Sequence, residues 1–218
     1  MTRPATRLWL CLAVATSVCA TSACATQSVT LEPGPRTFTS RDYDEVYERW
    51  TRDLTSFSFS RMSDVLHATA TFESWEFRWA YVIRYAQDHG LDADARTAML
   101  RATLQDASEH HRFLITLAAE NFADSDLTAT RAGWRVLLVD SHGRSIPASR
   151  VDAIRRPGPA EQHYFRSISR FRMAFRVVFP VAFPDGTPTI PRDTPYFLLR
   201  FTGAAGTRDV RWSTAADN

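Results

Sequence analysis

The chain has 218 residues, a length that suits one domain, or one domain plus a helical appendage. Its hydrophobic content of 44% is sufficient to build a core, and all 26 of its basic residues are Arg. The formal net charge of +2 makes nucleic acid a poor fit as a partner.

The first 25 residues have the three regions of an export signal. Arg3 and Arg7 give a positive start, an apolar stretch runs from Leu8 to Val18, and small residues follow. This stretch is shorter than the ~20 apolar residues that span a bilayer, and no later segment reaches that length. We therefore expect an exported protein and not a polytopic membrane protein.

All three cysteines, Cys11, Cys19 and Cys24, lie within this leader. The rest of the chain therefore has no disulfide, no thiolate metal site and no cysteine nucleophile. A body without free thiols fits an oxidising compartment outside the cytosol.

Two cleavage sites compete at the end of the leader. The segment Thr21-Ser22-Ala23-Cys24 resembles the lipobox of bacterial lipoproteins, although Thr21 replaces the usual aliphatic residue. The resemblance implies that Cys24 is acylated and becomes the first mature residue, and Ala25 after it implies sorting to the outer membrane of a two-membrane cell. The alternative is an A-x-A site over residues 23–25, which would release a soluble protein.

The chain is expected to divide into four parts: a signal peptide over residues 1–23, a linker over 24–38, a helical region with one or two strands over 39–130, and a β-rich region over 131–218. The last part is expected to form one domain with the segment before it.

Three helices are predicted in the region 39–130. Ser40 can cap a helix that runs to Leu54 with an aromatic stripe at three- and four-residue spacing. A second helix covers residues 74–89 and stops at a glycine. The third is capped by Asp92 and ends at residues 110–112, where cations favour the helix dipole.

Short apolar runs separated by turns predict strands over residues 65–72, 113–119, 134–139, 151–154, 171–179, 196–201 and 210–212. The clearest run alternates apolar residues with Arg, with Phe171 and Phe179 at its ends. We expect an α+β fold: an antiparallel, immunoglobulin-like β-sandwich with an N-terminal helix and a two-helix insertion between its first strands.

The two halves of the mature chain have opposite charge. Residues 24–130 hold 10 Arg and 17 acidic residues (net −7), and residues 131–218 hold 14 Arg and 7 acidic residues (net +7). The functional interpretation is a basic face that binds an anionic partner. The alternative is that the acidic helices pack over the basic sheet and neutralise it. The arginines expected to point away from the core are Arg135, Arg172, Arg176, Arg200 and Arg211.

Candidate chemistry is sparse. His110 and His111 point about 100° apart on a helix, so they do not chelate one metal ion. A carboxylate pair, Glu73 and Glu76, flanks Trp75 and could line an aromatic cleft with glycosidase chemistry. The spacing is also that of a solvated helix face. We expect no cofactor, no metal site and no catalytic residue.

The hypothesis from sequence is a non-enzymatic envelope protein. Lipid on Cys24 would tether it to the membrane, in the periplasm or at the outer membrane, and its surface would bind another envelope protein or an anionic envelope component. The alternative is an envelope hydrolase with its site in the aromatic cleft near Glu73, Trp75 and Glu76.

Overall fold

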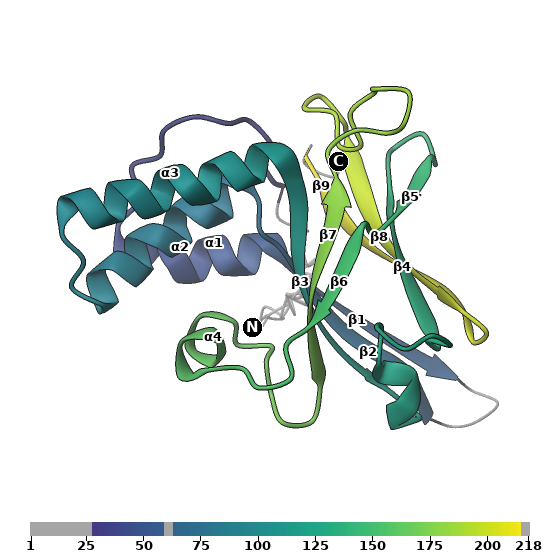
Figure 1. Cartoon of the computed structure of the whole chain (residues 1–218). Helices are drawn as coiled ribbons and strands as arrows, with labels where there is room; N and C mark the ends of the chain where they lie inside the picture. Colours follow the sequence, from purple (N-terminus) through teal and green to yellow (C-terminus); the bar gives the residue numbers. More distant parts are fainter. Residues whose placement is uncertain (1–27, 59–62, 215–218) are drawn as a thin grey trace, which may run out of the picture.

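A computed structural model describes residues 28–58 and 63–214, which form an α+β fold with two antiparallel sheets (Figure 1). The leader, including Cys24, lies outside the described residues. The elements in chain order are η1 (Ser40–Asp42), α1 (Tyr43–Trp50), β1 (Thr51–Ser58), β2 (Ser63–Phe72), α2 (Trp75–Asp88), α3 (Ala93–Glu109), β3 (His110–Ala119), η2 (Phe122–Ser125), β4 (Trp134–Val139), β5 (Ser145–Pro147), β6 (Arg150–Ala153), α4 (Pro159–Tyr164), β7 (Met173–Pro180), β8 (Tyr196–Gly203) and β9 (Gly206–Ser213).

One sheet has five strands in the order β1-β2-β3-β7-β6, and the other has four in the order β5-β4-β8-β9. All neighbouring strands are antiparallel. The helices α2 and α3 separate β2 from β3 in the sequence although these strands pair directly, so the predicted two-helix insertion is confirmed. Among the described helices, none is long and apolar enough to cross a membrane.

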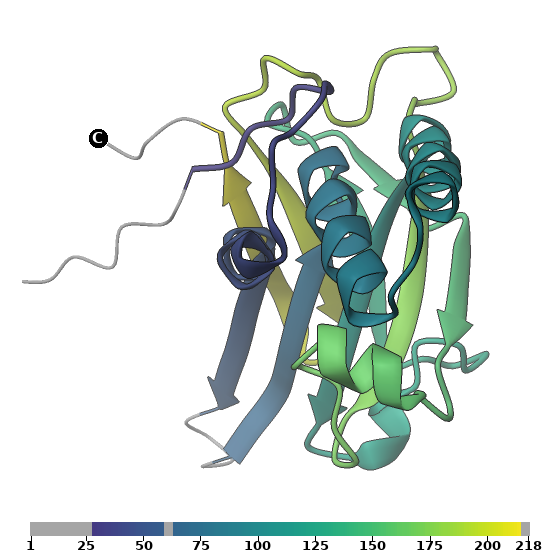
Figure 2. The ribbon, with the colours of Figure 1, turned by 90° about the vertical axis from the view of Figure 1, so that its left-hand side faces the viewer.

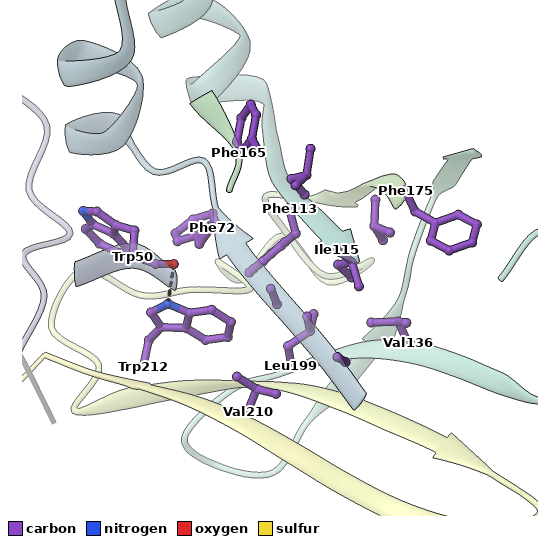
Figure 3. Packing of buried hydrophobic residues seen from close by; sticks show 14 of the residues in the cluster. Trp50, Phe72, Phe113, Ile115, Val136, Phe165, Phe175, Leu199, Val210 and Trp212 are labelled. Atoms are coloured by element: carbon purple, nitrogen blue, oxygen red, sulfur yellow. Dashed lines mark hydrogen bonds between the residues drawn. The ribbon is translucent and has the colours of Figure 1, made fainter. Parts of the chain in front are cut away.

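The core lies between the inner faces of the two sheets, where side chains of alternating positions meet (Figure 3). Phe72 stacks on its register neighbour Phe113 with ring centroids 4.7 Å apart. Phe113 in turn meets Trp212 of the other sheet edge-on at 5.6 Å. Alternation with a period of two puts one set of side chains in this core and the other set outside it.

Two tryptophans join the helices to both sheets. The indole of Trp50, at the end of α1, donates to Glu76 of α2 at 2.8 Å. The indole of Trp212 in β9 donates to the backbone oxygen of Trp50 at 3.1 Å (Figure 3). Both indoles are fully buried, so each N–H needs the partner that it has.

The helices cover one half of the outer face of the five-stranded sheet (Figure 2). An aromatic cluster fills the space beneath α1 and α2: Tyr43 contacts Phe77 with ring centroids 5.9 Å apart, and Tyr81 contacts Tyr164 at 5.2 Å. The hydroxyl of Tyr43 donates to the backbone oxygen of Tyr164 at 2.6 Å. Burial among these rings raises the pKa of Tyr81 to about 12.

Several predicted element boundaries are correct and others are wrong. Ser74 and Asp92 cap their helices as expected, and each side chain accepts a backbone N–H. The first helix ends at Trp50, and Leu54 lies in strand β1, which the sequence does not predict. Residues 110–112 begin β3 and do not end α3, because pairing with β7 extends the strand to His110.

Replacing Trp212 tests the packing of the two sheets. We expect Trp212→Ala to lower the free energy of unfolding by about 3–5 kcal/mol, because it leaves a large cavity and removes the hydrogen bond to Trp50. The measurement is the urea midpoint with an unchanged slope. The matched control is Arg135→Ala at an exposed position, expected to stay within about 0.5 kcal/mol of the wild type. Equal midpoints for both variants would contradict this packing.

Candidate functional site

The five arginines predicted to form one basic face lie on two opposite faces. Arg135, Arg200 and Arg211 are on the outer face of the four-stranded sheet, and Arg172 and Arg176 are on the outer face of the five-stranded sheet. Each residue points away from the core, as alternation predicts. The structure does not bring these residues onto one face. The strands that carry Arg135, Arg200, Arg211 and Arg176 belong to two sheets whose outer faces are turned away from each other. Arg172 lies just before β7 and contacts Thr69 of β2.

The four-stranded face is partly neutralised by its own side chains. Arg200 donates to both carboxylate oxygens of its cross-strand neighbour Asp209 at 2.8 Å, and this hydrogen bonding raises the pKa of Arg200. The guanidinium of Arg211 lies over the ring of Tyr196, 4.1 Å from its centroid. This face therefore offers less free charge than its sequence indicates.

The carboxylates of the predicted aromatic cleft do not converge. Glu76 accepts hydrogen bonds from Arg49 at 2.7 Å and from Trp50 at 2.8 Å. Glu73 instead faces the five-stranded sheet, and the indole of Trp75 donates to the backbone oxygen of Gly34. The two carboxylates thus serve different structural contacts, and the geometry gives the hydrolase alternative no paired acid and base.

At least one acidic residue of the acidic half, residues 24–130, pairs with an arginine of the basic half, residues 131–218. Glu73 lies between two arginines, 3.9 Å from Arg112 and 3.8 Å from Arg176. Because Arg176 belongs to the basic half and Glu73 to the acidic half, this contact is an instance of the expected neutralisation.

Arg78 holds α2 to α3 from a buried position with 2% exposure. It donates to the backbone oxygens of Glu73 and Thr103 at 2.8 Å each and forms an ion pair with Asp106. A second arginine, Arg112, donates to the same Asp106 at 2.6 Å. A buried charge requires partners of this kind. We therefore give Arg78, Arg112 and Asp106 a structural role, which is to hold α3 against α2 and β3.

Three connecting segments meet at one end of the two sheets, which we call the loop end. They are residues 120–133 between β3 and β4, 154–172 between β6 and β7, and 204–205 between β8 and β9, toward the bottom of Figure 1. Gly203 permits this meeting, because a Cβ there would lie 2.1 Å from the backbone oxygen of Gly133.

The loop end carries the most exposed large apolar side chains among the described residues. Phe122 is 69% exposed and Phe171 is 78% exposed. Phe122 lines a hollow of about 570 Å³ together with Ala153, Ile154 and Pro157. Residues 168–170 and 172–174 also line it, and Phe171 lies between them in the chain. Exposed aromatic side chains beside a hollow are typical of binding surfaces.

Arginines surround this hollow. Arg155, Arg170 and Arg172 line it, and Arg156 is exposed next to them. Arg172 donates to Thr69 at 2.8 Å, whereas Arg155, Arg156 and Arg170 make no hydrogen bond or ion pair within the described ranges. Arg155 does interact electrostatically with Asp126, and Arg170 lies over the ring of Phe171, 5.9 Å from its centroid. The surface therefore combines apolar rings with positive charge that is only partly compensated.

Phe171 is predicted from the sequence to lie in a strand, whereas in the structure this residue belongs to the loop end. Alternation places Phe171 on the inward side of a strand, but β7 begins at Met173 and Phe171 lies in the preceding loop. The triplet Arg170-Phe171-Arg172 is the signal that could reveal it, since a large ring between two cations after a breaker suits an exposed loop as well as a strand.

No group of three or more His, Cys, Asp or Glu that could hold a metal ion occurs in residues 28–58 and 63–214. His110 lies 3.5 Å from Asp106. Burial, with a smaller effect from the charges of Arg78 and His110, lowers the pKa of His111 to about 4.

Asp106 links stability to pH. Burial alone would raise the pKa of Asp106, but the hydrogen bond and charge of Arg78 outweigh it and lower that pKa. Because the pKa of Asp106 is lower in the folded than in the unfolded protein, its ionised carboxylate stabilises the folded state above about pH 4. This stabilisation is lost as the pH falls through the lowered folded-state pKa.

We expect Asp106→Asn to lower the free energy of unfolding at pH 7 and to approach the wild-type value by about pH 2. The measurement is urea unfolding at a series of pH values. Asp193→Asn, at an exposed position, is the control. A constant difference at every pH would contradict the assignment.

Comparisons with known proteins add little. No family model and no curated protein match the chain. A solved structure that matches is that of a novel protein of unknown function from Burkholderia pseudomallei, 14% identical, with 81% of this chain and 90% of that chain covered and a TM-score of 0.37. A TM-score of this size does not establish a shared fold, so the candidate site depends on the geometry above.

Proposed function

We propose that this chain is an exported envelope protein, anchored by lipid on Cys24, that binds another envelope protein through its loop end. The observation that carries the binding role is the pair of exposed phenylalanines, Phe122 and Phe171, beside a hollow bordered by arginines. The lipobox-like residues before Cys24 support the anchor.

We propose in addition that the fold is an immunoglobulin-like sandwich. The order β2-β3-β7-β6 corresponds to immunoglobulin strands A-B-E-D, and β5-β4-β8-β9 corresponds to C′-C-F-G. In this correspondence β1 is an added edge strand and α2–α3 an insertion between A and B. Residues 120–133 and 204–205 then take the places of the B–C and F–G loops, which bind antigen in variable domains. Fold alone does not fix function, so this correspondence only supports the choice of surface.

Val29, five residues after Cys24 in the chain, and the loop end lie at opposite ends of β9. The backbone N–H of Val29 donates to the oxygen of Ser213 at the end of β9, while Gly206 at its start adjoins the loop end. Eight residues of strand separate these points by about 23 Å. The five residues from Cys24 to Val29 span at most about 18 Å. The tether thus keeps Val29 near the bilayer and allows the loop end to face away from it.

The segment 154–172 of the loop end favours an acidic partner segment. It holds five arginines, of which Arg166 pairs with Asp44, and one acidic residue, Glu161. Residues 120–133 add one arginine and three acidic residues, so the three segments together keep a net charge of +2. Glu161 accepts the backbone N–H of Gly158 at the start of α4, so its charge is already engaged. Aromatic and Arg side chains are also the residues that most often carry binding energy in protein interfaces. A partner segment with acidic side chains around an apolar anchor fits this surface.

Fractionation tests the anchor. We expect wild-type protein to stay with membranes after a high-salt wash and Cys24→Ser to appear in the soluble fraction, because one residue carries all the lipid. Cys19→Ser, a matched leader cysteine, should fractionate like the wild type. The mass of the mature N-terminus separates an acylated Cys24 from cleavage after Ala25. Membrane retention of a Cys24→Ser protein whose leader has been cleaved off would exclude the lipid anchor, and the mass of its N-terminus shows whether cleavage has occurred.

Site-specific cross-linking tests the loop end. A photo-reactive amino acid at Arg156 should yield a protein adduct in cells, and the same group at Arg135, on the outer face of the four-stranded sheet, should not. We expect the double substitution Phe122→Ser with Phe171→Ser to reduce the Arg156 adduct at least tenfold without lowering stability, since both rings are exposed.

Two results would argue against this role. Equal adducts at Arg156 and Arg135 would show that the loop end is not a specific surface. Salt-sensitive binding of the lipid-free protein to anionic vesicles, lost in the double phenylalanine variant, would make a bilayer the occupant instead of a protein.

A further inference from the structure

A second hollow lies at the end of the molecule opposite the loop end; we call it the anchor-end cavity. Its volume is about 420 Å³, within the range of small-molecule sites. The N-terminal segment before η1, the start of α2, the end of α3, the start of β3 and the connection from β7 to β8 form its walls. Figure 2 shows the N-terminal segment and the β7–β8 connection passing above these helices.

The walls of the anchor-end cavity are largely apolar. Leu31 and Pro33 of the N-terminal segment face it together with Trp75 of α2, and Val181 and Ile190 line it from the β7–β8 connection. The indole of Trp75 donates to the backbone oxygen of Gly34 and so fixes the N-terminal segment as a wall. Such walls favour a ligand with an apolar body.

Two polar side chains in this cavity have unused hydrogen-bonding capacity. His111 makes no hydrogen bond with the described residues, and its Nε2 is buried. Its pKa of about 4 keeps the ring neutral at pH 7, so one ring nitrogen donates and the other accepts. Burying such an atom without a partner costs free energy, which a ligand recovers only if the ring of His111 turns this nitrogen toward the cavity.

The second polar side chain is Arg192. It is exposed at the wall of the cavity and forms no hydrogen bond or ion pair across the described ranges. No Asp or Glu occurs among the described residues that line this cavity. A guanidinium without an opposing carboxylate favours an anion, and its planar donors match a carboxylate.

We propose that the anchor-end cavity binds a small amphipathic carboxylate, with its apolar body against Leu31, Trp75 and Ile190 and its carboxylate held by Arg192 and His111. This site is independent of the loop end and does not require the lipid on Cys24. Its ligand class follows from the apolar walls, the single cation and the neutral imidazole.

Calorimetry with matched probes tests the proposal on the Cys24→Ser protein after removal of its leader, which leaves neither the lipid nor the apolar stretch Leu8 to Val18 to bind the probes. The probes are decanoate, decanol, decylamine and acetate, each below its micellar concentration. We expect decanoate to bind once per chain and decanol about tenfold more weakly, because a hydrogen bond to a charged group is lost. Decylamine and acetate should show no binding, since one has the wrong charge and the other lacks the apolar body.

Substitutions locate the site. Arg192→Gln should weaken decanoate about tenfold and leave decanol unchanged, and His111→Phe should also weaken decanoate. Ala107→Trp, at the α3 wall, should fill the cavity and abolish binding of both probes. Arg156→Gln, an exposed arginine of the loop end, is the control and should bind decanoate like the wild type.

Three results would overturn the proposal: no decanoate binding by the parent protein, equal binding of decanoate and decylamine, or unchanged decanoate binding in Arg192→Gln. If Ala107→Trp does not fold, Ile190→Trp fills the same cavity from the β7–β8 connection. Undiminished binding in a folded cavity-filling variant would place the ligand elsewhere.

Discussion

The structure depends on the contact between Trp50 and Trp212. The end of α1, the N-terminal part of α2 and strand β9 converge there, because Trp212 donates to the backbone of Trp50 and Trp50 donates to Glu76. Arg49 neutralises the buried carboxylate of Glu76 at 2.7 Å. One small cluster thus connects the helices on the outside of the five-stranded sheet with the core between the two sheets.

The two ends of the joined sheets carry different surfaces. At one end the chain enters beside Ser213, and the anchor-end cavity lies under the N-terminal segment. At the other end the connecting segments expose Phe122 and Phe171 with arginines between them. The helical layer covers part of one sheet face and pairs charges there, such as Glu73 with Arg176. The two ends carry the remaining candidate surfaces, since the two hollows and the exposed phenylalanines lie there. A tethered protein with a free far end suits recognition, and this is the role we propose.

The sequence predicts this architecture where periodicity and caps agree. Alternation identifies β7, and Ser74 and Asp92 mark the helix starts, because each signal is local. Strand β1 is not predictable, since the chain passes from Trp50 into the strand without a breaker and pairing with β2 decides its state. The arginines of the expected basic face show the same limit: alternation gives the outward side of a strand but not the sheet to which that strand belongs. The loop end depends on segments far apart in sequence, so a local pattern such as Arg170-Phe171-Arg172 can mark one exposed loop but not the surface that the segments form together.

Native-state hydrogen exchange of the wild type and of Glu76→Gln tests the central claim that this cluster makes the helices and both sheets one cooperative unit. We expect the most protected amides of α2 and β9 to open with the same free energy, and Glu76→Gln to lower the opening free energy of both. Opening of α2 at a distinctly lower free energy, with β9 unaffected by the substitution, would show that the helical layer unfolds on its own and not with the two sheets.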